Sequence, residues 1–175
     1  MVTSRMTEDL DAWLDRVDSH ARDACPEECC GLLLRRSTRG RICLEAHPCR
    51  NLQAELNARD PSAHPRTAAT GYYLDPACYL RVAQGAGERG AALVAVYHSH
   101  VEASAELSPL DRELVAPGGR PWQPELAQLV LSVVAGRVRE RRLYAWDDAE
   151  RSFREVAMSW LYGGPSPPSM QVART

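Results

Sequence analysis

Lysine is missing from this chain of 175 residues, and all 21 of its basic residues are arginine. Two explanations stay open: a GC-rich genome, whose codons favour arginine, or avoidance of exposed amines by a protein that works in a lysine-conjugating pathway. A basic surplus is also missing, since the formal net charge is −2. We therefore expect no nucleic-acid partner, because contacts to phosphates need an excess of basic side chains.

Long apolar segments are absent as well. The longest unbroken apolar run, Ala91 to Tyr97, is far shorter than the ~20 residues of a membrane-spanning helix. Residues 1–11 contain no apolar core of a signal peptide. These absences lead us to expect a cytoplasmic protein without a membrane partner. At ~150 residues per domain, the length predicts one domain, placed at residues 1–162. The tail at 163–175, with three prolines, is expected to be disordered.

Cysteine, in contrast, is frequent in the first half of the chain. Six are present: Cys25, Cys29, Cys30, Cys43, Cys49 and Cys78. Without a signal peptide, reduced thiols are expected rather than a disulfide framework. A structural zinc site made by the first five is an alternative, but their spacings match no zinc-finger pattern. We therefore expect thiols in the core or near the functional site.

Hydrophobic periodicity predicts helices and strands in mixed order. A first helix, capped by Thr7, is expected to end at Pro26. A second begins at Asp75-Pro76 and is ended by Gly85, Gly87 and Gly90, and Ser108-Pro109 begins a short third. The expected strands are residues 29–34, 42–49, 91–98, 129–134, 138–146 and 153–158, with loops at 51–71 and 117–124. This order indicates a mixed α/β sandwich around one sheet.

Two histidines follow the most apolar of these strands. His98 and His100 are two residues apart, so on a strand their side chains point to the same face. Asp111 lies one turn into the next helix and is a candidate third ligand. Two nitrogens and one carboxylate oxygen leave the fourth tetrahedral position open, as in catalytic zinc sites. Helix capping alone would explain Ser108 and Asp111, but it would not explain the two histidines.

This spacing resembles the signature of the JAMM (MPN-plus) metalloproteases: His-Ser-His, seven residues, Ser, two residues, Asp. The family's upstream glutamate lies, in bacterial members, in a Pro-x-Glu-x-Cys-Gly-Leu segment, and residues 26–32 resemble it in a way that favours Glu28 over Glu27. One departure is Val101, where most bacterial members have proline. The resemblance implies a bacterial, single-domain MPN (JAMM) fold of the α/β class. In that fold, helices sandwich a central mixed β-sheet, in a cytidine-deaminase-like arrangement.

The resemblance also implies a role for each site residue. One zinc ion would be held by His98, His100 and Asp111. Glu28 would take a proton from the zinc-bound water without ligating the metal, and Ser108 would donate a hydrogen bond to the oxyanion. Ser99 points to the opposite face of the strand and is expected to be structural.

The implied activity is that of a zinc-dependent (iso)peptidase that cleaves after the C-terminal diglycine of a ubiquitin-like protein, in deconjugation or in precursor processing. The loops at 51–71 and 115–124 are candidates to form a channel for that tail. Partners would include E1- or E2-like proteins of the same pathway. A peptidase acting on a sulfur-carrier protein in cysteine or cofactor biosynthesis is an alternative, and a non-catalytic MPN scaffold is another. A nucleobase deaminase is excluded, because the Pro-Cys-x-x-Cys that must accompany His-x-Glu is missing: Pro48-Cys49 lacks the second cysteine.

Overall fold

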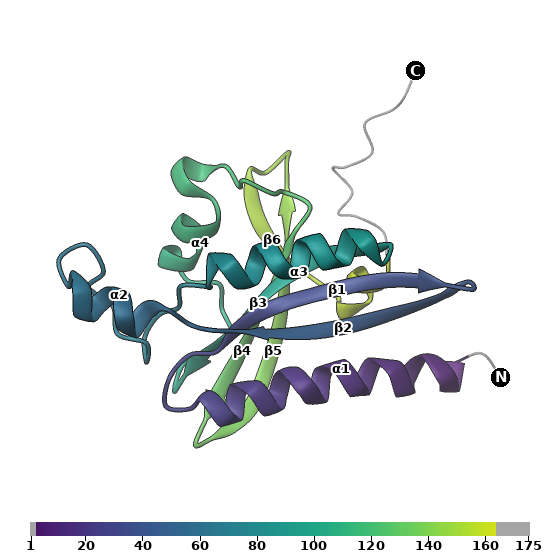
Figure 1. The fold of residues 1–175 in the computed structure, drawn as a ribbon, viewed down its shortest axis with the longest axis horizontal. Coiled ribbons are helices and arrows are strands. Elements are labelled where there is room, and N and C mark those ends of the chain that lie inside the picture. The colour runs from purple at the N-terminus through teal and green to yellow at the C-terminus, as the bar shows by residue number, and fades with distance from the viewer. Residues whose placement is uncertain (1–2, 164–175) are drawn as a thin grey trace.

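Six strands form one mixed sheet in the order β2-β1-β3-β4-β5-β6 in the computed structural model, which describes residues 3–163 (Figure 1). All but the first residue of the expected tail at 163–175 lies outside this range. The strands are β1 (Cys30–Thr38), β2 (Arg41–Cys49), β3 (Ala91–Val101), β4 (Ala127–Val134), β5 (Arg137–Asp147) and β6 (Ser152–Val156). The helices are α1 (Thr3–Ala24), α2 (Gln53–Arg59), α3 (Pro76–Glu88) and α4 (Pro109–Val115), with 3-10 helices at Pro117–Gly119 and Met158–Tyr162. None of the described helices is long and apolar enough to cross a membrane.

The strands β3 and β4 are the parallel pair at the centre of the sheet, and every other pairing is antiparallel. A parallel pair needs a crossover connection, and here α4 lies on that connection. Residues of the crossover, including α4, therefore lie over one face of the sheet, next to the end of β3. The expected α/β class with a central mixed sheet is confirmed.

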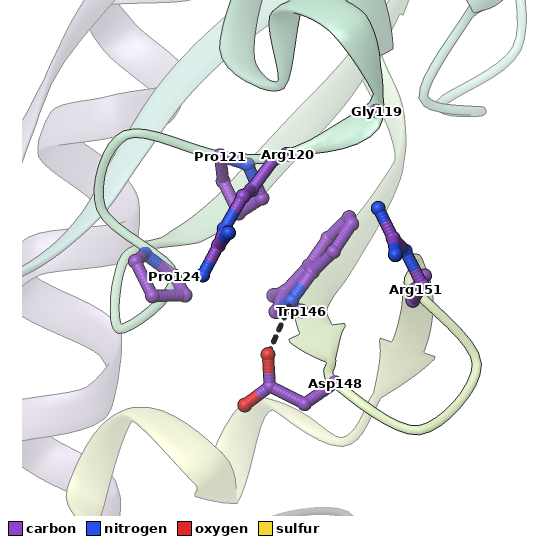
Figure 2. Close-up of a pocket in the computed structure, with 7 residues that line it drawn as sticks. All are labelled: Gly119, Arg120, Pro121, Pro124, Trp146, Asp148 and Arg151. Atoms are coloured by element: carbon purple, nitrogen blue, oxygen red, sulfur yellow. Dashed lines mark hydrogen bonds between the residues drawn. The ribbon is translucent and has the colours of Figure 1, made fainter.

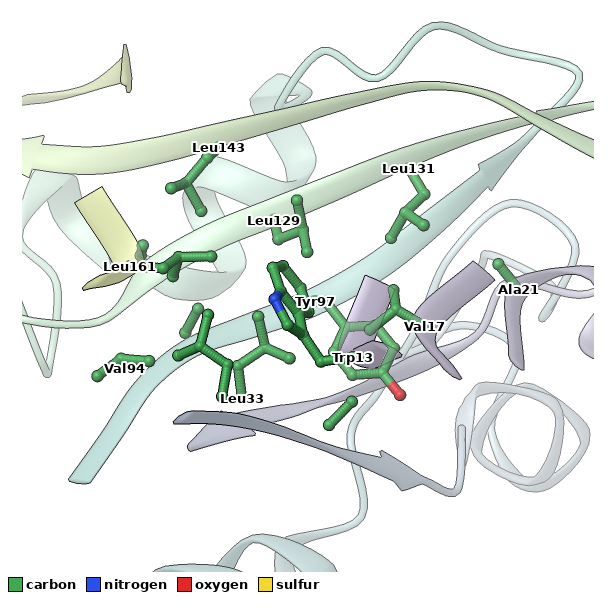
Figure 3. Packing of buried hydrophobic residues seen from close by; sticks show 14 of the residues in the cluster. Trp13, Val17, Ala21, Leu33, Val94, Tyr97, Leu129, Leu131, Leu143 and Leu161 are labelled. Atoms are coloured by element: carbon green, nitrogen blue, oxygen red, sulfur yellow. The ribbon is translucent and has the colours of Figure 1, made fainter. Parts of the chain in front are cut away.

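The two faces of the sheet are covered by different helices. α1 packs on one face against β2, β4 and β5, whereas α3 packs on the other against β1, β2 and β3. A large cluster of apolar side chains fills the α1 side (Figure 3). It includes Trp13, Val17, Ala21, Leu33, Tyr97, Leu129, Leu131, Leu143 and Leu161, each at most 3 % exposed. Burial of each large apolar side chain contributes about 1.5–3 kcal/mol, so this face supplies most of the hydrophobic stabilisation.

Two smaller apolar clusters lie on the other face. One, beneath α3, contains Leu32, Cys49 and Cys78. The other, beside α4, contains Ala105, Leu107, Ala116, Val130, Tyr144, Trp146 and Phe153. Polar side chains are buried on the sheet between them, and those side chains form the site described below.

Local signals placed several element boundaries correctly. Arg39 and Gly40 form the β1–β2 turn with positive φ of 52° and 75°. Asp75 caps α3, accepting a hydrogen bond from the backbone N–H of Ala77 at 2.8 Å. Ser108 caps α4 in a reciprocal capping box with Asp111, as expected.

Three expectations about helices are wrong. α1 is already helical at Thr3, so Thr7 lies inside it and is not the N-cap. The expected loop at 51–71 contains α2, a polar helix held in place by the buried side chain of Gln53, whose Nε2 donates to the Arg66 carbonyl at 2.7 Å. α3, expected to end at about Ala86, continues through Gly87 to Glu88, since a helical glycine costs only about 1 kcal/mol.

The expectation of six reduced thiols is wrong for one pair. A disulfide joins Cys49, at the end of β2, to Cys78, in the first turn of α3. Both residues belong to the cluster beneath α3, where packing brings their Cα atoms to 6.0 Å. The other four cysteines are free. Burial raises the pKa of the Cys29 thiol to about 12, so it stays protonated and packs as a small apolar side chain.

Candidate metal centre

Three candidate ligand atoms converge where β3 ends. The Nε2 atoms of His98 and His100 are 3.2 Å apart, and Asp111 Oδ2 lies 3.7 Å from the first and 3.1 Å from the second. Ligand atoms at bonds of about 2.0–2.1 Å around a tetrahedral zinc are about 3.3 Å from one another. The three side chains therefore already stand at the separations that such an ion requires. Among the described residues, they form the one group with metal-binding geometry.

Two elements supply these ligands. The side chains of His98 and His100 point to the same face of β3. Along the strand edge, these two residues pair with Val130 and Ser132 of β4. Asp111 is the third residue of α4, and its carboxylate accepts a hydrogen bond from the backbone N–H of Ser108 at 3.0 Å. The capping box thus fixes the first turn of α4 and aims the Asp111 carboxylate at the histidines.

Hydrogen bonds also set which nitrogen of each ring is available. His100 Nδ1 lies 2.8 Å from the Ser104 carbonyl oxygen, so Nδ1 carries the proton there and the Nε2 lone pair is free for a metal. The His98 ring is stacked on Tyr72 with centroids 4.3 Å apart. Its Nδ1 is buried with no hydrogen-bond partner, which is a feature that the metal does not explain.

Burial and charge determine the protonation of the ligands. Burial lowers the pKa of His98, so its imidazole is neutral at pH 7, the form that binds metals. Burial also acts to lower the pKa of His100, but the hydrogen bonds with Asp111 and the Ser104 carbonyl, together with the charges of Asp111 and Glu28, outweigh it and raise that pKa. Burial acts to raise the pKa of Asp111, but hydrogen bonds from His100 and His98 hold it well below its ordinary range. An ionised carboxylate beside neutral imidazole suits a divalent cation.

Glu28 lies two residues before β1, within the same buried region. Its side chain is 6 % exposed, and its Oε2 has no hydrogen-bond partner. Burial raises its pKa to about 7, against the opposing effect of His100. The backbone N–H of Glu28 donates to the Ala68 carbonyl at 2.7 Å, which fixes the segment. The structure therefore brings Glu28 together with the three candidate ligands, while Glu28 is not a member of the ligand group.

The two serines of the signature make different contacts. The hydroxyl of Ser108 donates to Asp111 Oδ2 and accepts from the Asp111 backbone N–H. Its hydrogen is thus occupied by the capping box. Ser99 Oγ accepts from the backbone N–H of Cys29 at 2.8 Å, which agrees with the expected structural role. Through this bond β3 positions the residue that follows Glu28.

Arg66 is a site residue that sequence reasoning missed. Its Nη1 lies 3.6 Å from Asp111 Oδ1, and its charge acts on Glu28 and on His98. It comes from the segment between α2 and α3, whose path cannot be read from local patterns. The signal available in the sequence was weak: one arginine in a loop that also holds two prolines.

Two of the cavities among the described residues are of note, and both lie outside the ligand group. An apolar groove of about 440 Å³ adjoins Tyr72, with walls from the start of α3 and from Leu114 and Val115 of α4. A second cavity, of about 240 Å³, lies between residues 119–124 and the β5–β6 turn (Figure 2). There Trp146 donates from Nε1 to Asp148 at 2.8 Å. No candidate site residue lines this second cavity.

Comparisons with known proteins find a matching family and relatives that are similar in sequence or in fold. Residues 10–156 match the family described as prokaryotic homologs of the JAB domain. Tail tip assembly protein K of Escherichia phage N15 is 32% identical over 109 residues, which are 62% of this chain and 36% of the phage protein. The chain thus spans about a third of the length of that curated relative.

Two solution structures are similar in fold. Protein DSY2949 of Desulfitobacterium hafniense is 20% identical, with a TM-score of 0.56, and the match covers 83% of this chain and 86% of that one. A protein of Salinibacter ruber is 27% identical, with a TM-score of 0.53. That match covers 82% of this chain and 84% of the other.

Proposed function

The chain belongs to the family of prokaryotic homologs of the JAB domain, and from this membership and its metal centre we propose that it is a zinc-dependent peptidase. Its substrate is a ubiquitin-like protein, cleaved after a C-terminal diglycine. The observation that carries the proposal is the convergence of His98, His100 and Asp111 at tetrahedral spacing, with the buried carboxyl group of Glu28 beside them.

The donor set of two imidazoles and one carboxylate is that of catalytic zinc, which keeps one position open. A zinc ion held there supplies polarisation of the scissile carbonyl and a lowered pKa for water. Glu28 accepts the proton of the attacking water and delivers it to the leaving amine. A carboxyl group with a pKa of about 7 is matched to both transfers at neutral pH. Once the capping hydrogen bond is released, Ser108 donates to the oxyanion.

The sheet supports the binding of an extended tail. Of the described strands, β1 pairs with β3 only as far as His98, and the backbone N–H of Ser99 still donates to the Cys29 carbonyl, so His100 and Val101 are the residues of β3 that have β4 alone as a strand neighbour and a side without a strand. An extended chain can add to such an open side through main-chain hydrogen bonds. A diglycine tail is narrow enough to do this beside the buried ligands. The segments at 51–71 and 115–124 are the candidates for its walls.

A role in assembly is the second candidate, because the similar phage protein is called a tail tip assembly protein. An assembly module would bind its partner without cleaving it. The ionisable ligands and the buried Glu28 argue for chemistry, since such groups destabilise a fold unless they serve a site.

Metal analysis and a fusion panel test the proposal. Purified protein should carry about one zinc per chain, and His98→Ala should remove it. A Gly-Gly tail should be cleaved on a cognate ubiquitin-like protein or sulfur carrier, and poorly as a free peptide or on an unrelated fold. Replacing the second-last glycine with leucine should abolish cleavage. A wild-type protein without metal, or one whose cleavage ignores a chelator, would make the peptidase proposal wrong.

A further inference from the structure

The two histidines of the metal centre are held in different ways. His100 Nδ1 bonds to the Ser104 carbonyl at 2.8 Å, which is the second contact that a metal-ligating histidine normally makes. His98 Nδ1 has no such contact, since it is buried without a hydrogen-bond partner among the described residues. The His98 side chain is nevertheless fully buried. A contact other than a hydrogen bond must therefore orient its ring.

An aromatic ring takes the place of that hydrogen bond. The ring of Tyr72 is stacked on the ring of His98, with centroids 4.3 Å apart and planes at 20°. Both residues are at most 3% exposed, so neither ring has free space around it. A stack of this kind blocks rotation of the imidazole about its Cβ–Cγ bond, because the turning edge would collide with the phenol ring. The Nε2 atom of His98 thus stays directed at Asp111.

The ring of Tyr72, rather than its hydroxyl group, makes this contact. The hydroxyl is buried and has no hydrogen-bond partner among the described residues. A buried hydroxyl without a partner destabilises a fold, so this one contributes nothing to the hold on His98. A phenylalanine side chain should therefore orient the histidine as well as tyrosine does. A leucine side chain has no planar face and should not.

The backbone that carries Tyr72 is fixed by the amide of Asn51. Its Nδ2 donates to the carbonyls of Glu28 at 2.9 Å and of Gly71 at 3.2 Å. Its Oδ1 accepts from the backbone N–H of Tyr73 at 2.9 Å and from that of the first residue of α2 at 2.9 Å. All four hydrogen-bonding positions of the amide are thus in use. The residues on both sides of Tyr72 are tied to the segment that contains Glu28.

We propose that Tyr72, anchored by Asn51, is the positioning residue of the metal centre and orients His98 by ring stacking in place of a hydrogen bond. This inference rests on the proposed zinc-dependent function. Neither Tyr72 nor Asn51 belongs to the ligand group. Tyr72 sets the affinity of the centre for zinc, and Asn51 couples the orientation of this ligand to the segment of Glu28.

The affinity for zinc tests the proposal without turnover. It is measured on metal-free protein by competition with a chromogenic chelator. Tyr72→Leu should weaken zinc binding about 10–100-fold, the usual effect of removing the partner of a metal ligand. Tyr72→Phe should bind zinc as tightly as the wild type. An unchanged affinity in Tyr72→Leu, or an equal loss in Tyr72→Phe, overturns the assignment of the stacked ring.

Tyr73→Leu is the matched control. This neighbouring tyrosine makes an edge contact with His64, at 6.2 Å and 87°, and His64 is not a candidate ligand. Its replacement removes an equal side chain from the same segment and should leave zinc affinity unchanged. Far-UV spectra and melting temperatures verify that each variant is folded. A loss in Tyr73→Leu as large as that in Tyr72→Leu would show a general loosening of the segment and overturn the inference.

Asn51→Asp tests the anchor while keeping the ring of Tyr72. The carboxylate retains the two accepted hydrogen bonds but loses the two donated ones, to Glu28 and Gly71. Zinc binding should weaken. A double variant with Tyr72→Leu should lose no more than the weaker-binding single variant, because both changes act on one ring. Additive losses overturn the anchoring role. If Tyr72→Leu does not fold, an unchanged affinity in Asn51→Asp overturns the proposal by itself.

The wild-type protein separates failure of this inference from failure of the proposed function. A wild type that binds about one zinc per chain, with the same affinity in Tyr72→Leu and Asn51→Asp, overturns the inference and leaves the peptidase function intact. A wild type that binds no zinc overturns the peptidase function itself.

Discussion

The face of the sheet that packs on α1 is buried by one continuous apolar cluster, whereas the opposite face carries two smaller clusters with the metal centre between them. β3 contributes to both faces. Tyr97 packs in the α1 cluster, and the flanking His98 and Ser99 are buried beside it without being apolar. Val130 of the cluster beside α4 pairs with His98 across the strands. The apolar cluster that stabilises the fold and the candidate metal ligands therefore lie on opposite faces of one sheet.

The candidate metal ligands on β3 are therefore supported by the apolar cluster on the opposite face of the sheet. The α1 cluster stabilises β3 and β4, and β3 in turn presents its histidines to the other side. Substitutions at the metal centre should therefore lower activity and leave the fold intact. Substitutions in the α1 cluster should lower stability and leave the chemistry intact. Four predictions test this difference.

The largest effect is expected from Glu28→Gln. The amide is similar in shape but cannot accept the proton of water, so cleavage should fall at least ~10²–10⁴-fold. Zinc content and the far-UV spectrum should match those of the wild type. Glu27→Gln, at an exposed neighbouring position, is the matched control and should keep its activity. Loss of activity in the control alone would place the general base one residue earlier.

Leu129→Ala tests the opposite face. Leu129 is fully buried in the α1 cluster, and truncation of such a leucine lowers the free energy of unfolding by about 2–5 kcal/mol. Denaturant titration should show this loss. Below the melting temperature, the folded protein should bind about one zinc and cleave at nearly the wild-type rate. A large loss of metal from folded protein would show that the two faces are not separate.

A smaller effect should appear in the pH dependence of stability of metal-free protein. Because burial raises the pKa of Glu28 from 4.5 to about 7, the folded state holds this proton more tightly than the unfolded state. The resulting stabilisation is present below pH 4.5 and is lost as pH rises through about 7. Glu28→Gln should therefore be more stable than the wild type at pH 8, by on the order of 3 kcal/mol, and equal to it near pH 4. Equal stability at both pH values would show that Glu28 is not buried in solution.

The smallest effect is expected from Ser99→Ala. It removes the hydrogen bond to the Cys29 backbone N–H and should lower the free energy of unfolding by about 1 kcal/mol. Since that bond positions the residue after Glu28, kcat should fall modestly while zinc content is unchanged. An unchanged kcat with lowered stability would assign Ser99 to the fold alone.

Contiguous patterns made much of the site predictable. The histidines two apart, the helix start at Ser108 and the spacing to Asp111 are local features, so the sequence alone supplied the candidate ligands. Glu28 needed the family resemblance, because nothing local relates it to residues seventy positions later. The roles of Glu28 and Ser108 stay predictions until variants are measured.

Features that depend on tertiary contacts were not predictable. The path of the segment between α2 and α3 decides that Arg66 reaches Asp111, and no periodicity encodes that path. The pairing of Cys49 with Cys78 follows from the packing of α3 on the sheet. α2 was missed because it is short and polar, with one buried side chain, Gln53. Each of these is a contact between segments rather than a property of one segment.

The disulfide has a topological consequence for the wall of the metal centre. By joining Cys49 to Cys78, it closes residues 50–77 into a covalent ring that contains α2, Arg66 and Tyr72. A peptide bond cut anywhere in that ring leaves a single covalent molecule. Limited proteolysis in this segment would then be invisible on a non-reducing gel and would release two pieces only after a reductant is added. A nicked molecule could keep the ends of the ring in place and continue to present its arginine to the site.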